Sequence, residues 1–246
     1  FNEQEEARFI VDRISAWVES GGFRRDCALL YRSNAQSSAL EEALLQRGLP
    51  YVVYGGQKFY DRLEIRNALA YLRLIWNRHD DPAFERVINT PTRAIGERTV
   101  EDIRAYARER DCSLWQAADE LTQTGRMTAR ASNAVRSFIS LINRLDVETR
   151  EEPLHKIADH AITASGLLDF HRNEKGEKGL SRVENLQELV GACKAFEPED
   201  SEEPVLGQFL ATTALDAGDA QAEPDSDSVQ LMTLHSAKGL EFPLVF

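Results

Sequence analysis

The chain has 246 residues, of which 42% are hydrophobic, and its formal net charge at pH 7 is -12. These values suit one or two compact globular units, and no apolar run reaches the ~20 residues needed to span a bilayer. The acidic start of the sequence lacks the basic and apolar regions of a secretion signal, and the three widely spaced cysteines form neither a zinc motif nor a disulfide framework. We therefore expect a cytoplasmic protein with reduced thiols, no metal site and no membrane association.

The first 54 residues predict a helix followed by a strand–helix–strand unit. Apolar residues recur at helical spacing through residues 2–19, and Gly21-Gly22 ends that helix. Two short apolar runs then flank a second helical pattern, which Ser33 or Asn34 can cap. Short connections within such a unit imply that its strands are parallel. The predicted strands are Cys27–Tyr31 and Pro50–Tyr54, and the helix between them is Ala35–Gln46.

A long helical region follows, with no convincing strand from Arg62 to about Ala217. Its predicted helices are residues 62–77, 82–89, 100–110, 114–121, 129–149, 153–165, 182–196 and 205–215.

The acidity of the chain belongs to the end of this region. Between Ala195 and Ser228 there are ten carboxylates and no Lys or Arg, so the net charge of -12 falls to -2 without them. Residues 217–228 are also rich in Gly, Ala and Ser, which predicts a flexible acidic linker. Basic surfaces elsewhere remain compatible with the net charge, because salt screens distant charges.

The segment Val229–Phe246 joins two apolar runs through a polar loop. Its first run alternates as a strand does, and Pro243–Phe246 forms the second. Open parallel sheets bind ligands where their strands end, so the loop is a candidate site. From the residues alone, a solvated turn between two core strands remains the alternative. The loop carries hydroxyl, imidazole, ammonium and carboxylate groups on Thr233, His235, Ser236, Lys238 and Glu241.

Motifs for nucleotide hydrolysis are absent from the sequence. No segment has the G-x-x-x-x-G-K-[ST] spacing that wraps backbone amides around phosphates. Asp119-Glu120 follows a helical pattern rather than a strand, so we expect it on a solvated face and not at a magnesium ion. No spacing of His, Cys or carboxylates supports a metal site or a catalytic triad. We expect no catalytic residue in this chain, no activity from it alone and no ligand bound to it.

Three stretches resemble motifs of the UvrD/Rep/PcrA group of superfamily-one DNA helicases. TLHSAKGLEF at residues 233–242 is similar to motif V of that group. LLYRSNAQS at residues 29–37 resembles its segment that touches single-stranded DNA, and residues 55–75 resemble the entry into its helical subdomain. The resemblance implies contacts to single-stranded DNA by Arg32, Asn34, Thr233 and His235, and a bond from Glu241 to the ribose of ATP.

The loop Thr90–Thr99 is a third candidate site. Its glycine permits a tight turn, and Thr99 can cap a helix that starts at Val100. Amide groups at such a helix start are free to bind phosphate. An ordinary connector between two helices explains the same residues equally well. The loop resembles the Gly-Ile-Gly duplex-binding motif of the same helicases, with Ala94 in place of the first Gly. The resemblance implies duplex DNA contacts by Thr92, Arg93, Ile95, Gly96 and Thr99.

Several further side chains receive structural assignments. Arg62 and Arg66 lie one helical turn apart, and we expect them on a solvated face. Strand and helix spacing assigns five aromatic residues to packing rather than to stacking on bases: Tyr51, Tyr54, Phe59, Tyr60 and Trp76.

The resemblance covers essentially the whole chain and implies its architecture. The fold is expected to be α/β with a large all-α insertion and mostly helical overall. A partial RecA-like parallel sheet of the P-loop NTPase type lacks its P-loop half. Residues 1–54 and 229–246 belong to the second RecA-like domain, 55–216 to the inserted helical subdomain, and 217–228 to the linker.

The implied function is that of a fragment of an ATP-dependent 3′-to-5′ DNA helicase in DNA repair. Its partners are single-stranded DNA and strand–duplex junctions, and the full-length enzyme uses ATP and Mg. Two alternatives stay open. The helical insertion and acidic segment can instead form a docking or regulatory module that binds repair proteins, or the chain can belong to a related helicase-nuclease subunit.

Overall fold

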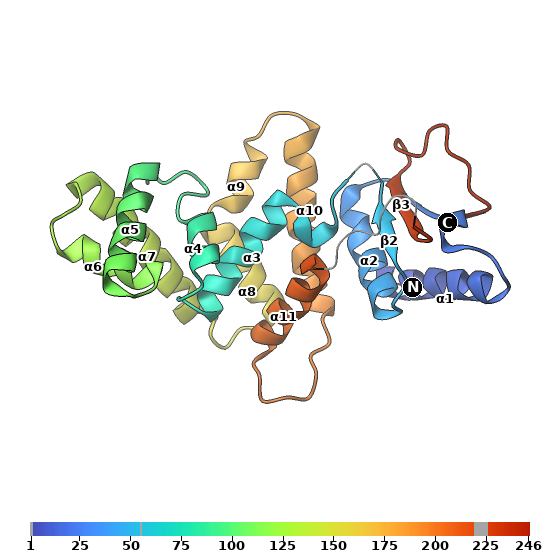
Figure 1. Cartoon of the computed structure of the whole chain (residues 1–246), viewed down its shortest axis with the longest axis horizontal. Helices are drawn as coiled ribbons and strands as arrows, with labels where there is room; N and C mark the ends of the chain where they lie inside the picture. Colours follow the sequence, from blue (N-terminus) through green and yellow to red (C-terminus); the bar gives the residue numbers. More distant parts are fainter. Residues whose placement is uncertain (1, 55, 219–225) are drawn as a thin grey trace. The chain divides into compact units, whose positions relative to one another are not determined.

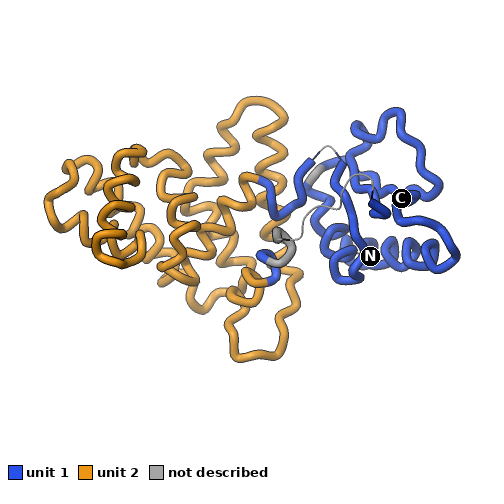
Figure 2. The backbone as a smooth tube through the Cα atoms, in the orientation of Figure 1, with its two compact units in different colours: residues 1–62, 212–246 blue, residues 63–211 orange. Residues whose placement is uncertain are grey.

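The computed structural model describes residues 2–54, 56–218 and 226–246. The chain forms two compact units, shown along the sequence in Figure 1 and by colour in Figure 2. Unit 1 comprises Phe1–Arg62 and Thr212–Phe246, and unit 2 comprises Leu63–Ala211. The first division lies later than the residue 54 expected from the sequence, and the second lies earlier than residue 216.

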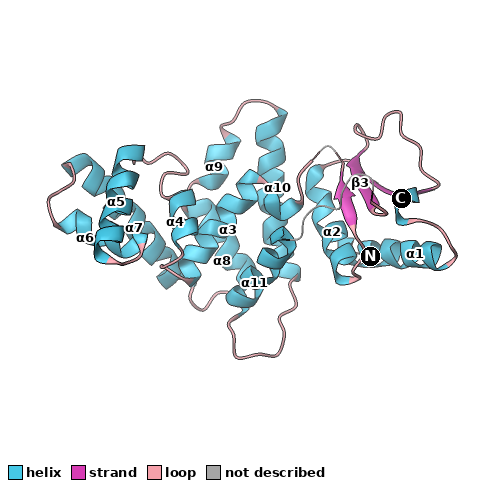
Figure 3. Ribbon diagram, in the orientation of Figure 1, coloured by secondary structure: helices cyan, strands magenta, loops and turns pink. Residues whose placement is uncertain are grey.

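Unit 1 combines a small sheet with two main helices (Figure 3). In chain order its elements are α1 (Glu3–Glu19), a 3-10 turn (Arg24–Asp26), β1 (Cys27–Tyr31), a second 3-10 turn (Asn34–Gln36), α2 (Ser37–Gln46), β2 (Tyr51–Val53), a third 3-10 turn (Phe59–Asp61), the end of α11 (Val205–Gly218), β3 (Val229–Thr233) and β4 (Leu244–Val245).

The sheet has the order β2-β3-β1-β4, and all its pairs are parallel, as the strand–helix–strand pattern predicted. β3 returns from the far end of the sequence and pairs between β1 and β2, with Leu29 opposite Leu231 and Val53 opposite the same residue. The unit formed by β1, α2 and β2 therefore depends on the C-terminal segment for its central hydrogen bonds.

The core of unit 1 lies between the sheet and the pair α1 and α2. Alternate strand residues such as Leu29 and Leu231 are at most 1% exposed, and they pack with Val11 and Ile14 of α1 and Leu44 of α2. The helical spacing in α1 thus buries one stripe, as the periodicity predicted. Residue Asn2 caps α1 in a reciprocal pair with Glu5, which satisfies amides that the first helical turn leaves open.

A buried ion pair joins α2 to residues 59–62 in unit 1. Glu41 is 1% exposed and accepts hydrogen bonds from the Ser37 hydroxyl at 2.5 Å and the Phe59 amide at 2.9 Å. The Arg62 guanidinium lies 3.8 Å from the Glu41 carboxylate and donates to Ser37 at 2.7 Å. The prediction of a solvated Arg62 is therefore wrong, because this carboxylate draws the side chain inside, whereas Arg66 is exposed.

Unit 2 is all helical among its described residues (Figure 3). Its helices are α3 (Leu63–Trp76), α4 (Asp81–Val87), α5 (Glu97–Arg110), α6 (Leu114–Gln123), α7 (Ala129–Thr149), α8 (Leu154–Ala164), α9 (Leu167–Arg172), α10 (Glu177–Ala195) and the start of α11 (Val205–Gly218).

The bounds of α7 match the prediction, whereas α9 and the first turn of α10 were not predicted. The predicted helix started at residue 182, but α10 begins at Glu177, directly after Gly176. Gly179 is needed inside that helix, because a Cβ on it would lie 2.5 Å from the carbonyl oxygen of Glu174 and 2.8 Å from that of His171. The first turn of α10 therefore packs closely against the backbone of residues 171–174, which the local sequence pattern does not indicate.

The predicted linker lies partly outside the described residues. α11 extends to Gly218, residues 219–225 are not described, and Asp227 pairs with Arg24 at 3.2 Å before β3 begins. Among the described residues, no helix is both long and apolar enough to cross a bilayer.

Replacing Arg62 tests the buried ion pair. Arg62→Leu removes the guanidinium from the buried Glu41 carboxylate and from the Ser37 hydroxyl, so we expect the free energy of unfolding of unit 1 to fall by about 3–5 kcal/mol. Urea denaturation measures the loss. The matched control is Arg66→Leu on the exposed face, for which we expect a change within about 0.5 kcal/mol. Equal effects of the two changes would contradict the assignment.

Candidate nucleic-acid interface

Two segments that lie far apart in the sequence end side by side in unit 1. β1 ends at Tyr31 and β3 ends at Thr233, and these two residues are register partners in a parallel pair. The amide of Leu234 donates to the carbonyl of Tyr31 at 3.0 Å. Arg32 and His235 therefore leave the sheet at the same carboxyl edge, which brings together the two segments predicted to hold a single strand.

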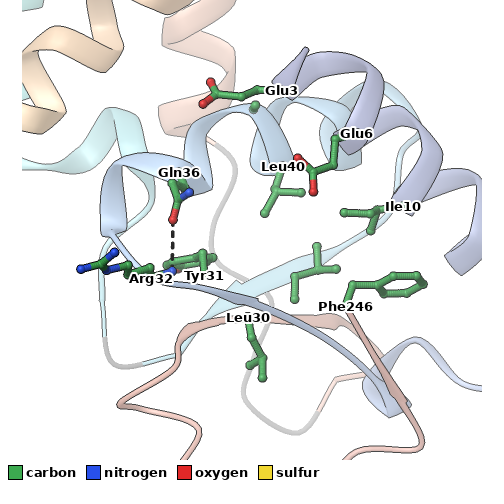
Figure 4. A pocket seen from close by; sticks show the side chains of 11 residues that line it. Glu3, Glu6, Ile10, Leu30, Tyr31, Arg32, Gln36, Leu40 and Phe246 are labelled. Atoms are coloured by element: carbon green, nitrogen blue, oxygen red, sulfur yellow. Dashed lines mark hydrogen bonds between the residues drawn. The ribbon is translucent and has the colours of Figure 1, made fainter. Parts of the chain in front are cut away.

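The Arg32 segment has a fixed backbone and an exposed side chain. Gln36 Oε1 accepts from the amides of Arg32 at 3.1 Å and Ser33 at 3.2 Å, the first of which is drawn in Figure 4. Ser33 Oγ accepts from the Ala35 amide at 3.3 Å, so this segment forms a 3-10 turn and does not cap a helix at Ala35 as predicted. The side chain of Asn34 lies outside the described part of the structure.

A cavity of about 300 Å³ lies beside this edge, between α1, α2 and β1 (Figure 4). Apolar side chains line it together with the carboxylates of Glu3 and Glu6. Burial, and secondarily the nearby Glu41 carboxylate, raises the pKa of Tyr31 to about 12, so this residue adds no charge at neutral pH. Both charged groups of α1 that line the cavity are carboxylates, so we expect phosphate to bind Arg32 from its solvent side rather than from within the cavity.

The loop after β3 is a tight turn with an exposed imidazole. The Thr233 hydroxyl lies 2.9 Å from the Ser236 hydroxyl and accepts from the Ser236 amide at 3.2 Å. Gly239 has φ of +86°, a conformation that favours glycine. His235 and Lys238 are exposed on this turn. The turn therefore fixes the backbone while leaving both basic side chains open to a ligand.

Tyr54 is a residue of this edge that the sequence analysis missed. It follows β2 directly, and its amide donates to the carbonyl of Leu231 at 2.8 Å. Its side chain is 48% exposed, whereas Tyr51 and Phe59 are buried as predicted. The assignment of Tyr54 to packing is wrong, because the residue that follows a short strand projects past the core. Its position after a strand, at the edge that also carries Arg32, was the available signal.

Glu241 lies apart from the single-strand candidates. It is exposed on the loop before β4, and the first residue of β4, Leu244, pairs with Cys27 at the start of β1. The loop therefore carries the chain from the carboxyl edge of the sheet, where His235 lies, toward the amino edge. The structure separates the predicted ATP contact from the predicted DNA contacts.

The predicted duplex-binding loop of unit 2 is held by Arg93. Its guanidinium donates to the carbonyls of Val87 at 3.2 Å, Pro91 at 2.9 Å and Ser165 at 2.8 Å. It also lies over the rings of Tyr71 and Phe138, at 5.7 and 5.6 Å from their centroids. Burial raises the pKa of Tyr71 to about 12 despite the nearby cation. The charge of Arg93 is thus directed into unit 2.

The backbone of the loop turns around Asn89. Its side-chain oxygen accepts from the amides of Arg93 at 2.7 Å and Ile95 at 3.2 Å, and the Ile95 side chain is 1% exposed. Thr92, just before Arg93, and Gly96, just after Ile95, are exposed. The loop therefore presents its backbone and small side chains outward and its large side chains inward.

The start of α5 differs from the sequence prediction. The helix begins at Glu97 with Gly96 at the N-cap, and no side chain caps it. Thr99 lies inside the first turn and its amide donates to the Gly96 carbonyl at 2.9 Å, so Thr99 as the cap is wrong. Ala94 has φ of +60°, in the left-handed region. The position where related motifs carry Gly thus keeps a glycine-like backbone.

Among the described residues, no group of three or more His, Cys, Asp and Glu side chains is arranged to hold a metal ion. Burial raises the pKa of the Cys27 thiol to about 11 and that of the Cys193 thiol to about 12, so both are protonated at neutral pH.

The sequence is similar to known helicases along its whole length. The model of the UvrD-like helicase C-terminal domain family matches residues 1–246. The chain is 54% identical to DNA helicase II of Escherichia coli (strain K12), with 100% of this chain and 34% of that protein aligned. It is 38% identical to the ATP-dependent DNA helicase PcrA of Staphylococcus aureus (strain Mu50), with 99% of this chain and 33% of that protein aligned. The chain spans about a third of the length of these relatives.

Replacing Ala94 tests the strain in the loop of unit 2. Ala94→Gly removes a left-handed alanine, which costs about 1–2 kcal/mol, while the freer unfolded chain offsets about 0.4–1 kcal/mol. We expect the free energy of unfolding of unit 2 to rise by about 0.5–1 kcal/mol, measured by urea denaturation with Trp115 fluorescence.

The control for this change is Ala94→Val. A β-branched side chain fits a positive φ poorly, so we expect a loss of stability. A destabilised Ala94→Gly variant would show that the alanine methyl group contributes more than its backbone conformation costs.

Proposed function

This chain belongs to the UvrD-like helicase C-terminal domain family, and from that premise we propose that it is part of an ATP-dependent DNA helicase. The proposed enzyme moves 3′ to 5′ along single-stranded DNA and acts in DNA repair. Unit 1 then supplies part of the second RecA-like domain, and unit 2 is its helical subdomain. In this proposal the single strand lies along the carboxyl edge of the sheet.

The observation that carries the proposal is the shared edge of β1 and β3. Their register places Arg32 and Thr233 at neighbouring strand ends, with His235 one turn further on. A guanidinium forks onto phosphate oxygens, and an imidazole donates a hydrogen bond to phosphate in either protonation state. Together with the Asn34 amide, these groups suit contacts to a sugar–phosphate backbone that do not depend on base sequence.

Tyr54 adds an aromatic surface to the same edge. Its half-exposed ring lies at the end of β2, next to β3 in the sheet. Every base has a π-face, so stacking on tyrosine holds single-stranded DNA with little preference for sequence. We propose that the Tyr54 ring stacks on a base, whereas Arg32 contacts the phosphates.

Duplex DNA is proposed to contact the loop between α4 and α5. Thr92 and Gly96 are its outward residues, and Thr99 is half-buried in the first turn of α5. An uncapped helix start offers amides to phosphate. The hydrogen bonds of Arg93 and the burial of Ile95 hold the backbone of this loop on its inner side.

ATP and Mg are proposed cofactors of the longer protein. Glu241 is exposed, so its carboxylate can accept hydrogen bonds from ribose hydroxyls. The hydrolytic groups and the magnesium ligands are assigned to parts of the protein beyond this chain. This chain alone is expected to be inactive as an ATPase.

A second candidate function is that of a docking module for repair proteins. The specific observation in its favour is a groove on unit 2 whose lining is mostly apolar and includes the carboxylates of Asp146, Glu151 and Glu152. The two functions use different surfaces, so one protein can have both.

Replacing Arg32 in the intact helicase tests the single-strand site. Arg32→Ala removes one phosphate cation, so affinity for an oligonucleotide should fall and the slope of log K against log salt should flatten by about 0.7. His235→Ala should weaken binding further. Fluorescence anisotropy across a salt series measures both quantities.

The matched control is Arg47→Ala. Arg47 follows α2, close to the start of β2 and therefore at the amino edge, and it pairs with Asp12. We expect its affinity and slope to match the unmodified helicase. An unchanged slope in Arg32→Ala would remove Arg32 from the proposed site.

Replacing Tyr54 separates stacking from charge. Tyr54→Ala should cost about 1–3 kcal/mol of single-strand binding with the salt slope unchanged, because no phosphate contact is lost. Tyr54→Phe keeps the ring and should bind as the unmodified helicase does. Equal binding by the alanine and phenylalanine variants would show that the ring does not stack on a base.

A further inference from the structure

Unit 2 contains an apolar groove whose lining shares no residue with the loop Thr90–Thr99. It has a volume of about 620 Å³ and lies where the ends of α3, α7 and α10 meet the starts of α8 and α11. These elements meet in the lower part of Figure 1, where the loop between α10 and α11 projects. Apolar side chains dominate its lining, including Trp76, Leu154, Ile157, Phe196, Val205 and Leu206.

The groove presents large apolar groups to solvent in a fixed arrangement. Trp76, which the sequence assigned to packing, is 44% exposed, and Val205 is 39% exposed. α11 approaches the indole so closely that a Cβ on Gly207 would lie 2.8 Å from a Trp76 ring carbon. The Phe196 ring packs edge-on against Phe209, at 5.4 Å between centroids. The surface is therefore preformed, as a docking site for an apolar anchor requires.

The rim of the groove is acidic. Asp146, Glu151 and Glu152 line the groove together with the cations Arg150 and Lys194. Five more exposed carboxylates lie on the loop between α10 and α11, whose residues Phe196 and Pro204 belong to the lining. Such a rim repels nucleic acid and anionic membranes and attracts a basic ligand. The carboxylates of the loop are Glu197, Glu199, Asp200, Glu202 and Glu203.

One side chain holds the acidic loop in shape. Gln208 Oε1 accepts from the Glu199 amide at 2.8 Å, and its Nε2 donates to the Ser201 hydroxyl at 3.0 Å and the Glu203 carbonyl at 2.7 Å. Like charges on a short loop repel one another, so an unsupported loop would spread into solvent. These hydrogen bonds keep the carboxylates gathered beside the apolar floor.

We propose that this groove docks a basic amphipathic segment of another protein. The apolar face of that segment lies on Trp76 and Val205, and its Lys and Arg side chains face the acidic loop. An amphipathic helix in an apolar groove is a common mode of recognition, and the charged rim supplies specificity and association rate. A second copy of this chain suits the groove poorly, because each carries a net charge of -12. This surface goes beyond the proposed DNA contacts.

Peptide binding to the full-length helicase tests the proposal. The probe is a fluorescent helical peptide of about four turns with Lys and Arg on one face and Leu and Trp on the other. The variant combines Glu199→Gln, Asp200→Asn and Glu202→Gln, whose side chains are exposed. The matched control neutralises three exposed carboxylates of α5 that lie outside the groove lining, through Glu101→Gln, Asp102→Asn and Glu109→Gln.

We expect the groove variant to bind the peptide about tenfold more weakly at low salt, with a flatter salt dependence, and the control to bind normally. Val205→Ser should also weaken binding, because it removes part of the apolar floor. A version of the peptide with Glu in place of Lys and Arg should not bind.

Several results would overturn the proposal. Equal binding by the groove variant and the control would mean that the acidic loop does not recognise the peptide. Equal binding of the acidic peptide would indicate unspecific apolar contact, and no binding to the unmodified protein would mean that the groove is closed to such partners. Self-association that is lost in the groove variant, without an effect on the peptide, would make a second copy the occupant.

Discussion

The parallel pairing of β1 with β3 is the constraint on which unit 1 depends. β1 and β2 are not hydrogen-bonded to each other, and β3 supplies the ladder that joins them. Parallel strands need a long crossover, and here the return to β3 passes through all of unit 2. The carboxyl edge therefore forms only when β3 has paired with β1 and β2. The residues proposed to contact single-stranded DNA follow directly on strands that the hydrogen bonds of the sheet hold in place.

Charge is separated within the chain, so a strongly acidic protein can still carry the basic edge that is proposed to contact DNA. The carboxyl edge of unit 1 presents Arg32, His235 and Lys238. The acidic residues gather instead on the loop between α10 and α11, where Gln208 holds the backbone. Because the Debye length at physiological salt is about 8 Å, salt screens charges that lie farther apart than this, so a basic surface and an acidic surface can coexist in one chain. The net charge alone is a poor guide to the partners of such a chain.

The loop between α4 and α5 shows how a fold retains a shape that its residue does not favour. Ala94 adopts a left-handed conformation, while Asn89 and Arg93 bind the loop backbone on either side of it. The burial of Ile95 adds to the same restraint. These interactions outweigh the local preference of one alanine, so the outward backbone keeps the form suited to a phosphate contact.

The sequence by itself determined the strand–helix–strand unit, the parallel sheet and most helices, and α7 matched at both ends because its apolar period is long and local. The sequence also placed Arg32 and Thr233 at strand ends, but it missed the exposed Tyr54 at the end of β2. Only the tertiary structure decided that β3 lies between β1 and β2, that Arg62 is buried, and that Tyr54 and Trp76 are exposed. Each of these depends on partners distant in the sequence, such as Glu41 for Arg62, and a local pattern carries no information about such partners.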